Sequence, residues 1–185
     1  MSKAMDSIQK SELNVRTFLG LIIFFSKFTK YLNKTKLNKL MFFTDFGYYS
    51  KTKEKITSAR YIHMPFGPVP EEIDIYLAEL EEKEFIDINV NFTSFLEYRI
   101  KAVDDIEFFN YLFEKQKLLD DTQLGFAHMV NDKFGRRTAG FLSDFSHELT
   151  PYKNTKEYHP ISYEEILKPQ PLLNNIPLHE YIESL

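Results

Sequence analysis

The chain has 185 residues, of which 43% are hydrophobic and 27% charged, and its net charge is −4. This length and composition fit one globular domain that is large enough to bury a core of its own. The absence of cysteine excludes disulfides, thiolate catalysis and cysteine-based zinc sites, and predicts a cytoplasmic location.

The charge is divided unevenly along the chain. Residues 1–60 carry 12 Lys and Arg against 4 Asp and Glu, whereas residues 61–185 carry 11 against 23. Such asymmetry is typical of contact with nucleic acid or an acidic partner, and also of two halves that attract each other. The loose spacing of the early lysines favours a solvated helix face; these are Lys27, Lys30, Lys34, Lys36 and Lys39. The acidic second part suits a basic partner.

Residues 1–10 are polar and without periodicity, which predicts a disordered lead-in. Apolar residues then recur at helical spacing from Glu12 to Tyr31 and predict a buried helix. Its longest apolar run has eight residues, against the ~20 that cross a bilayer, so we expect no membrane contact. Thr35 is the expected cap of a second helix, whose apolar stripe contains Leu37, Leu40, Met41, Thr44 and Tyr48.

A strand is predicted from Thr57 to Met64, after a charged turn at residues 51–55. Pro65 to Pro70 reads as a constrained turn, because Gly67 permits a positive φ and prolines fix theirs. Pro70 suits the first turn of the next helix, where its missing N–H has no partner to lose.

Two runs of alternating apolar and polar residues follow, at 86–92 and 96–102, joined through Thr93-Ser94. Period-two alternation on both sides of a short connection predicts an amphipathic β-hairpin. Helix, helix, strand, helix and hairpin is the order of a winged-helix unit. We therefore expect a mainly α (α+β) fold: a helical domain with a small antiparallel sheet and a winged-helix-like N-terminal half.

The remaining chain reads as helical. Asp104 or Asp105 caps one helix, and residues 121–134 form another that ends at Gly135, a residue suited to a left-handed stop. Residues 137–149 predict a helix that turns Thr138, Phe141, Leu142 and Phe145 inward, with Pro151 just past its end.

Ser162-Tyr163-Glu164-Glu165 predicts a capping box that opens a last short helix. Residues 169–185 are rich in Pro and Asn and read as a C-terminal tail with weak helix near its end.

Metal and cofactor chemistry find no support in the motifs. His147-Glu148 lacks the second histidine that zinc proteases carry, since position 151 is proline. No pair among His63, His128, His147 and His159 has ligand spacing, and phosphate-loop and dinucleotide motifs are absent. We expect no metal and no cofactor.

Ser143 and His147 lie four residues apart beside Asp144, so a hydrolase with Ser143 as nucleophile and His147 as base stays open. No G-x-S-x-G elbow presents the serine, and no oxyanion donors are evident. The favoured reading is that these polar groups bond to the helix end and the preceding turn, and that the chain is not an enzyme.

Two short blocks carry the most information. Phe66-Gly67-Pro68-Val69 follows the early strand, and Leu142-Ser143-Asp144-Phe145-Ser146-His147 precedes Pro151-Tyr152. Together with residues 37–45, they resemble the SocA-like Panacea domain, a family of antitoxins and phage-associated proteins. The likeness spans about residues 35–167 and implies a single domain over residues 11–168. Family members often carry Trp where this chain has Met64 and Tyr152.

The resemblance implies an antitoxin in a toxin–antitoxin system that neutralises, by direct protein–protein contact, a toxin encoded by the adjacent gene. One variant of the family delivers its toxin to a protease instead. The alternative from another class is a DNA-binding transcriptional regulator that uses the winged-helix-like half. DNA affinity that does not change between low and physiological salt concentration would count against this alternative, because phosphate contacts weaken as salt rises.

The expected partner-binding residues are Phe66, His147 and Tyr152, which lie near element ends. Tyr152 is either the most exposed of them, because Pro151 turns the chain outward, or a lid packed on the helix. The residues expected to be structural within the two blocks are Gly67, Pro68, Val69, Ser143, Asp144 and Pro151. Gly67 needs a backbone conformation that a Cβ would penalise.

Overall fold

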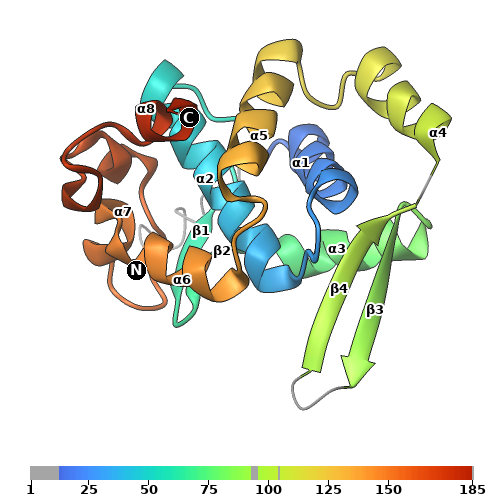
Figure 1. Cartoon of the computed structure of the whole chain (residues 1–185), viewed down its shortest axis with the longest axis horizontal. Helices are drawn as coiled ribbons and strands as arrows, with labels where there is room; N and C mark the ends of the chain where they lie inside the picture. Colours follow the sequence, from blue (N-terminus) through green and yellow to red (C-terminus); the bar gives the residue numbers. More distant parts are fainter. Residues whose placement is uncertain (1–12, 93–95, 104, 185) are drawn as a thin grey trace, which may run out of the picture.

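The computed structural model describes residues 13–92, 96–103 and 105–184. The predicted disordered lead-in at residues 1–10, the Thr93-Ser94 connection and Asp104 lie outside the described residues. The described chain is mainly helical, with two small antiparallel hairpins, which confirms the predicted fold class. Figure 1 shows helices grouped around α2, with the β3–β4 hairpin projecting from one side.

Helix α2 (Lys34–Thr52) runs through the middle of the molecule, and every residue from Lys36 to Ser50 is buried. A helix enclosed on all sides needs partners around its whole circumference. These are α1 (Val15–Phe28), α5 (Asp121–Phe134), α6 (Ala139–Glu148), α8 (Leu178–Glu183) and the strands β2 and β4. Asn33, not Thr35, caps α2: its side chain accepts a hydrogen bond from the Lys36 N–H at 2.8 Å. The Thr35 prediction was wrong by two positions.

Aromatic side chains fill the core around α2. Phe46 stacks on Tyr163 with ring centroids 4.4 Å apart, and Phe43 packs against Phe134 at 4.7 Å. Such pairs add to the stability that burial of the rings provides. Most of the phenylalanines therefore serve the core rather than a partner surface.

The first hairpin corrects the predicted turn. β1 (Tyr61–Met64) pairs with β2 (Gly67–Pro70), and only Pro65 and Phe66 remain in the loop. The prolines of β2 are tolerated because β2 is an edge strand, with β1 as its one neighbour in the sheet. Pro70 therefore pairs with Tyr61 instead of opening α3 (Ile73–Glu82), which begins after Glu72.

The second hairpin is confirmed: β3 (Ile86–Phe92) pairs with β4 (Leu96–Ala102). β4 also docks on the α1–α2 loop, where the Ile100 N–H donates to the Leu32 carbonyl at 2.9 Å. The predicted winged-helix-like order differs in one respect: an additional strand, β2, follows β1, and these two strands pair in a sheet separate from β3 and β4.

Asp105 caps α4 (Ile106–Asn110), which continues into a π-helical turn at Tyr111–Lys115. α5 begins at a capping box of Asp120 and Gln123. It ends at Gly135 as predicted, but the glycine has φ −62°, so the left-handed stop was wrong. The Gly135 carbonyl instead accepts a hydrogen bond from the Lys36 ammonium at 2.6 Å, which satisfies this helix end.

α6 begins after Thr138, which caps it from outside, and Phe141 is half-exposed. Two of the four side chains expected inside are therefore not buried; Leu142 and Phe145 are. Pro151 was expected just past the end of a helix. It lies instead in the first turn of a further short helix, α7 (Thr150–Lys153).

Ser162 caps the 3₁₀ helix η2 (Tyr163–Leu167) by accepting from the Glu164 N–H at 3.3 Å, without the reciprocal bond of a capping box. Residues 169–185 contain η3 (Pro171–Leu173) and α8. Leu173, Leu178 and Ile182 are buried in the main core, so this segment packs against α2 and α5. None of the helices in the described ranges is long and apolar enough to cross a membrane.

Candidate partner-binding site

The β1–β2 hairpin requires glycine at its turn. Gly67 has φ +97°, a conformation that side-chain-bearing residues rarely adopt. A Cβ at this position would also lie 2.3 Å from Lys39 Cε and 2.6 Å from Ser146 Oγ. The turn lies directly against α2 and α6. Glycine is therefore required for a steric reason as well as for the predicted backbone conformation.

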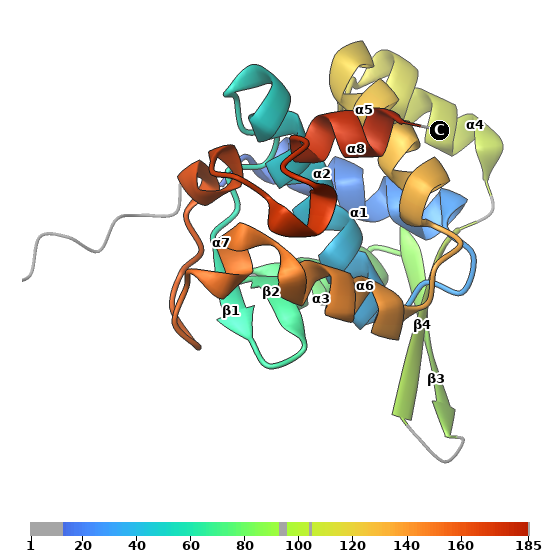
Figure 2. The same ribbon diagram turned by 60° about the vertical axis from the view of Figure 1, so that its left-hand side comes forward.

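Three side chains from three helices hold the carbonyls of this hairpin. Ser143 of α6 donates to the Phe66 carbonyl at 2.8 Å, and Tyr152 of α7 donates to the Met64 carbonyl at 2.9 Å. Lys39 of α2 donates to the Pro68 carbonyl at 3.1 Å. Figure 2 shows the hairpin, α6 and α7 on the same side of the molecule. The turn is thereby fixed, while the side chain of Phe66 is 75% exposed.

Tyr152 does not point outward. Only 9% of it is exposed, because α7 carries it back against β1 and α6. Its ring lies between His63 and His147, with centroids 3.6 Å and 4.5 Å away. The expectation that Tyr152 is the most exposed candidate was wrong, and it packs as the lid that the alternative described.

Lys39 is a buried residue of this site that the sequence analysis placed on a solvated helix face. It is 0% exposed, and burial lowers the pKa of its ammonium to about 7. Lys36 is buried too, so the reading of these lysines as a solvated face was wrong for both. A signal exists: positions 36, 39, 43 and 46 share one face of a helix, and the last two are Phe.

The histidine of the late block lies beside this lysine. Burial, followed by the nearby charge of Lys39, lowers the pKa of His147. Both His147 Nε2 and His63 Nδ1 are buried without a hydrogen-bond partner among the described residues. Lys39, His147 and Tyr152 thus lie beneath the hairpin, and His63, which belongs to β1, stacks on Tyr152 from the hairpin side.

The hydroxyl of Ser143 forms its hydrogen bond with the hairpin rather than with His147. Its hydroxyl donates to Phe66, and Ser146 donates to the Ser143 carbonyl at 2.7 Å. The favoured reading had these polar groups bond to the helix end and the preceding turn; the Ser143 hydroxyl bonds instead to a hairpin 77 residues away along the chain. Asp144 is exposed, whereas Pro68 and Pro151 are buried and Val69 is half-buried.

A second buried ionisable group fixes the start of β1. Asp45 accepts hydrogen bonds from the Thr57 N–H at 3.0 Å, from the Thr57 hydroxyl at 2.5 Å and from the Tyr61 hydroxyl at 2.7 Å. Burial raises the pKa of this carboxyl to about 6, although the hydrogen bonds favour its charged form. The sequence analysis did not single out Asp45, because an aspartate in mid-helix reads as solvated.

The other histidines make different contacts. His128 packs edge-on against Phe24 at 4.7 Å, and His179 Nδ1 lies 2.9 Å from Ser50 Oγ. His159 is exposed. No three metal-ligating side chains converge in the ranges that the structure describes.

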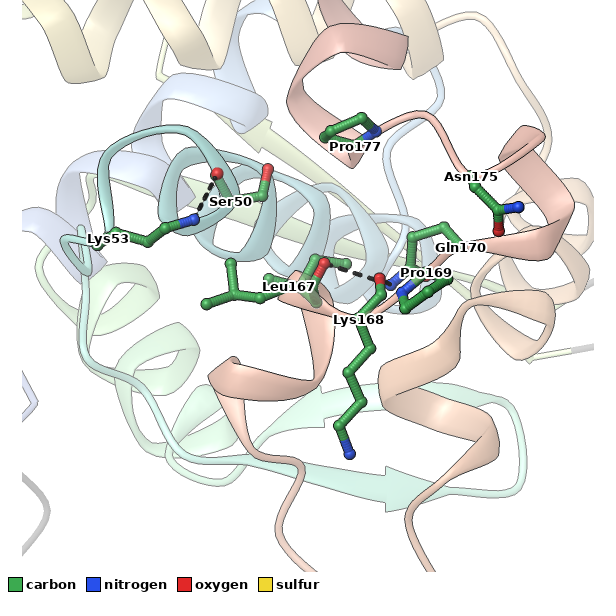
Figure 3. Close-up of a pocket in the computed structure, with 9 residues that line it drawn as sticks. Ser50, Lys53, Leu167, Lys168, Pro169, Gln170, Asn175 and Pro177 are labelled. Atoms are coloured by element: carbon green, nitrogen blue, oxygen red, sulfur yellow. Dashed lines mark hydrogen bonds between the residues drawn. The ribbon is translucent and has the colours of Figure 1, made fainter.

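A pocket of about 260 Å³ lies at the end of α2, against the segment after η2 (Figure 3). Its polar groups bond to the chain itself: the Lys53 ammonium donates to the Ser50 carbonyl at 3.1 Å, and the Gln170 amide donates to the Lys168 carbonyl at 2.9 Å. The remaining lining is largely apolar, with Ile166, Leu167, Pro169 and Pro177. This lining offers a ligand few polar contacts.

Comparison with known proteins places the hairpin and its supports in one family. The pattern described as "Antitoxin SocA-like, Panacea domain" matches residues 37–153, more than half of the chain. This confirms the resemblance drawn from the sequence. The matched range contains Lys39, Gly67, Ser143 and Tyr152, which hold or form the turn. No curated protein and no solved structure matches the chain.

Proposed function

Because this chain belongs to the SocA-like Panacea family, we propose that it is an antitoxin that neutralises a toxin protein by direct contact. The partner is the product of the adjacent gene, and the encounter takes place in the cytoplasm. The chain acts by occupying the toxin and carries out no catalytic step itself.

The observation that supports this proposal best is the exposure of Phe66 on a fixed turn. The Phe66 side chain is large, apolar and 75% exposed, so burying it in an interface would contribute favourably to the free energy of binding. Because hydrogen bonds from Ser143, Tyr152 and Lys39 already hold the backbone around it, little further ordering is needed on binding. Aromatic anchors on such pre-organised elements commonly dominate binding energy.

The three expected contact residues thereby divide into two roles. Phe66 touches the toxin, while Tyr152 and His147 position the hairpin from beneath. Tyr152 is suited to positioning because both its ring and its hydroxyl are engaged inside the protein. His147 is suited to it because its ring stacks on Tyr152.

The test is to express the adjacent gene alone and together with this chain, and to measure growth. We expect arrest in the first case and growth in the second. Phe66→Ala is expected to weaken toxin binding by ~30-fold or more without a change in melting temperature. Ile75→Ala is the matched control, since Ile75 on α3 is a similarly exposed apolar side chain.

Equal arrest with and without the chain would refute the antitoxin role. Unchanged affinity in Phe66→Ala would remove the hairpin from the interface and leave that role intact. The amount of toxin in the co-expressing cells separates two routes: it stays constant under direct neutralisation, and falls if the toxin is delivered to a protease.

A further inference from the structure

Cationic side chains from three segments far apart in the sequence come together where α2 and α6 begin. Lys30 lies in the α1–α2 loop, Arg99 in β4, and Arg136 and Arg137 in the α5–α6 turn. Figures 1 and 2 both show the first turns of α2 and α6 side by side, with β4 next to them. Of the early lysines, Lys30 contributes to this surface, whereas Lys36 and Lys39 are buried.

A buried ammonium ties two of these segments together. Lys36 donates to the Lys30 carbonyl at 2.9 Å and to the Gly135 carbonyl at 2.6 Å. The two carbonyl oxygens are therefore within hydrogen-bond reach of one nitrogen. The exposed side chains of Lys30 and Arg136 consequently start from neighbouring stretches of backbone.

Aromatic rings lie within the same surface. The Arg99 guanidinium carbon is 5.2 Å from the centroid of Tyr31, which is 72% exposed. The Arg137 guanidinium carbon is 5.0 Å from the centroid of the half-exposed Phe141. Each arginine is thus held over a ring, which orients its planar donors at little further entropic cost.

Backbone dipoles add to the positive potential. α2 and α6 both begin here, and neither has an acidic residue in its first turn. Lys34 pairs with Asp74, but Lys30, Arg136 and Arg137 form no ion pair with a carboxylate in the described part of the chain. Their charges are therefore available to an anionic partner.

We propose that this surface, formed by Lys30, Tyr31, Arg99, Arg136, Arg137 and Phe141, binds the phosphate backbone of a nucleic acid. Paired guanidinium groups, exposed rings and two helix N-termini are the groups that contact phosphates and bases. The chain is net acidic, so the attraction is local to this surface. The proposal does not depend on the antitoxin role, because Phe66 is not part of the surface.

The test is fluorescence anisotropy of the full chain with a labelled duplex of about 30 base pairs and with a single strand of the same length, between about 50 and 200 mM salt. We expect binding that weakens as salt rises. Replacing both arginines (Arg136→Gln, Arg137→Gln) should weaken binding ~10-fold or more and lower the salt slope by about 2. Both side chains are exposed, and Lys30→Gln serves as a milder second variant with the same direction of effect.

The control is the double variant Lys83→Gln with Lys117→Gln. It removes the same number of positive charges from two exposed lysines outside the proposed surface. Its affinity should stay within about twofold of the wild type. Preference for the duplex supports backbone contact along DNA, and preference for the single strand supports stacking of bases on Tyr31 and Phe141. The absence of binding to either probe at low salt, or equal losses in the arginine and control variants, would overturn the proposal.

Discussion

The ammonium nitrogen of Lys39 lies 3.1 Å from the carbonyl oxygen of Pro68, directly against the glycine turn of the β1–β2 hairpin. A cation with no exposed surface thus contributes to fixing the one turn that presents an exposed phenylalanine. Burying an ammonium group costs free energy unless it is well paired. The hydrogen bond to the Pro68 carbonyl offsets part of this cost.

Gly67→Val should lower the free energy of unfolding by about 1–3 kcal/mol, because it forces a β-branched residue to a positive φ and against Lys39 and Ser146. Urea denaturation measures the change. Gly125→Ala is the control, since a Cβ there meets nothing within 4 Å and mid-helix alanine should raise stability by roughly 0.5–1 kcal/mol. Equal stability of the Gly67 variant and the wild type would contradict the close approach described here.

Tyr152→Phe should cost about 1 kcal/mol, because it removes only the hydrogen bond to the Met64 carbonyl and keeps the stacked ring. Tyr152→Ala should cost roughly 3–5 kcal/mol, since it also removes the ring between His63 and His147. Thermal and chemical denaturation of both variants measure this difference. A Tyr152→Ala variant as stable as the wild type would show that the ring does not pack as a lid.

Lys39→Met should change the pH dependence of stability in the alkaline range. The folded-state pKa of Lys39 is about 7, against an ordinary lysine value of 10.5, so between these values the unfolded chain binds a proton that the folded chain has released. The stability of the wild type relative to Lys39→Met should therefore rise with pH from about 7 to 10.5. The rise should be at most roughly 5 kcal/mol.

Urea denaturation of both proteins at several pH values above 7.5 tests this, because His147, whose pKa is lowered by burial and by the charge of Lys39, is then uncharged. A stability difference that is flat over this range would mean that the buried lysine keeps its ordinary pKa.

Asp45→Asn should remove a pH dependence of stability that lies at acidic pH and has the opposite sign to that of Lys39. The carboxyl has a folded-state pKa of about 6, above the ordinary aspartate value of 3.8, so protonation favours the folded state. The stability of the wild type relative to Asp45→Asn should fall as pH rises from about 4 to 6, by roughly 3 kcal/mol. Denaturation curves across this interval provide the measurement, and a difference that grows with pH would reverse the assignment.

Elements with local signals were predictable from the sequence. The β3–β4 hairpin follows from its alternation, and α5 follows from its periodicity between Asp120 and Gly135. The strand β2 was missed because Pro68 and Pro70 read as turn residues, while the single-neighbour position that tolerates them is a property of the assembled sheet. Pro151 was read as a helix stop, although it equally suits the first turn of α7.

The family, the β3–β4 hairpin and the need for glycine at the β1–β2 turn could be predicted from the sequence, because they depend on motifs and on local backbone preferences. The burial of Lys39 and Lys36, the inward position of Tyr152 and the approach of the Lys30 and Gly135 carbonyls to one ammonium group result from the packing of distant segments. A buried lysine needs hydrogen-bond acceptors for its ammonium group, and distant segments of the chain can supply them. Here the acceptors are Pro68 and Gly135, 29 and 99 residues away along the chain, beyond the reach of any local pattern.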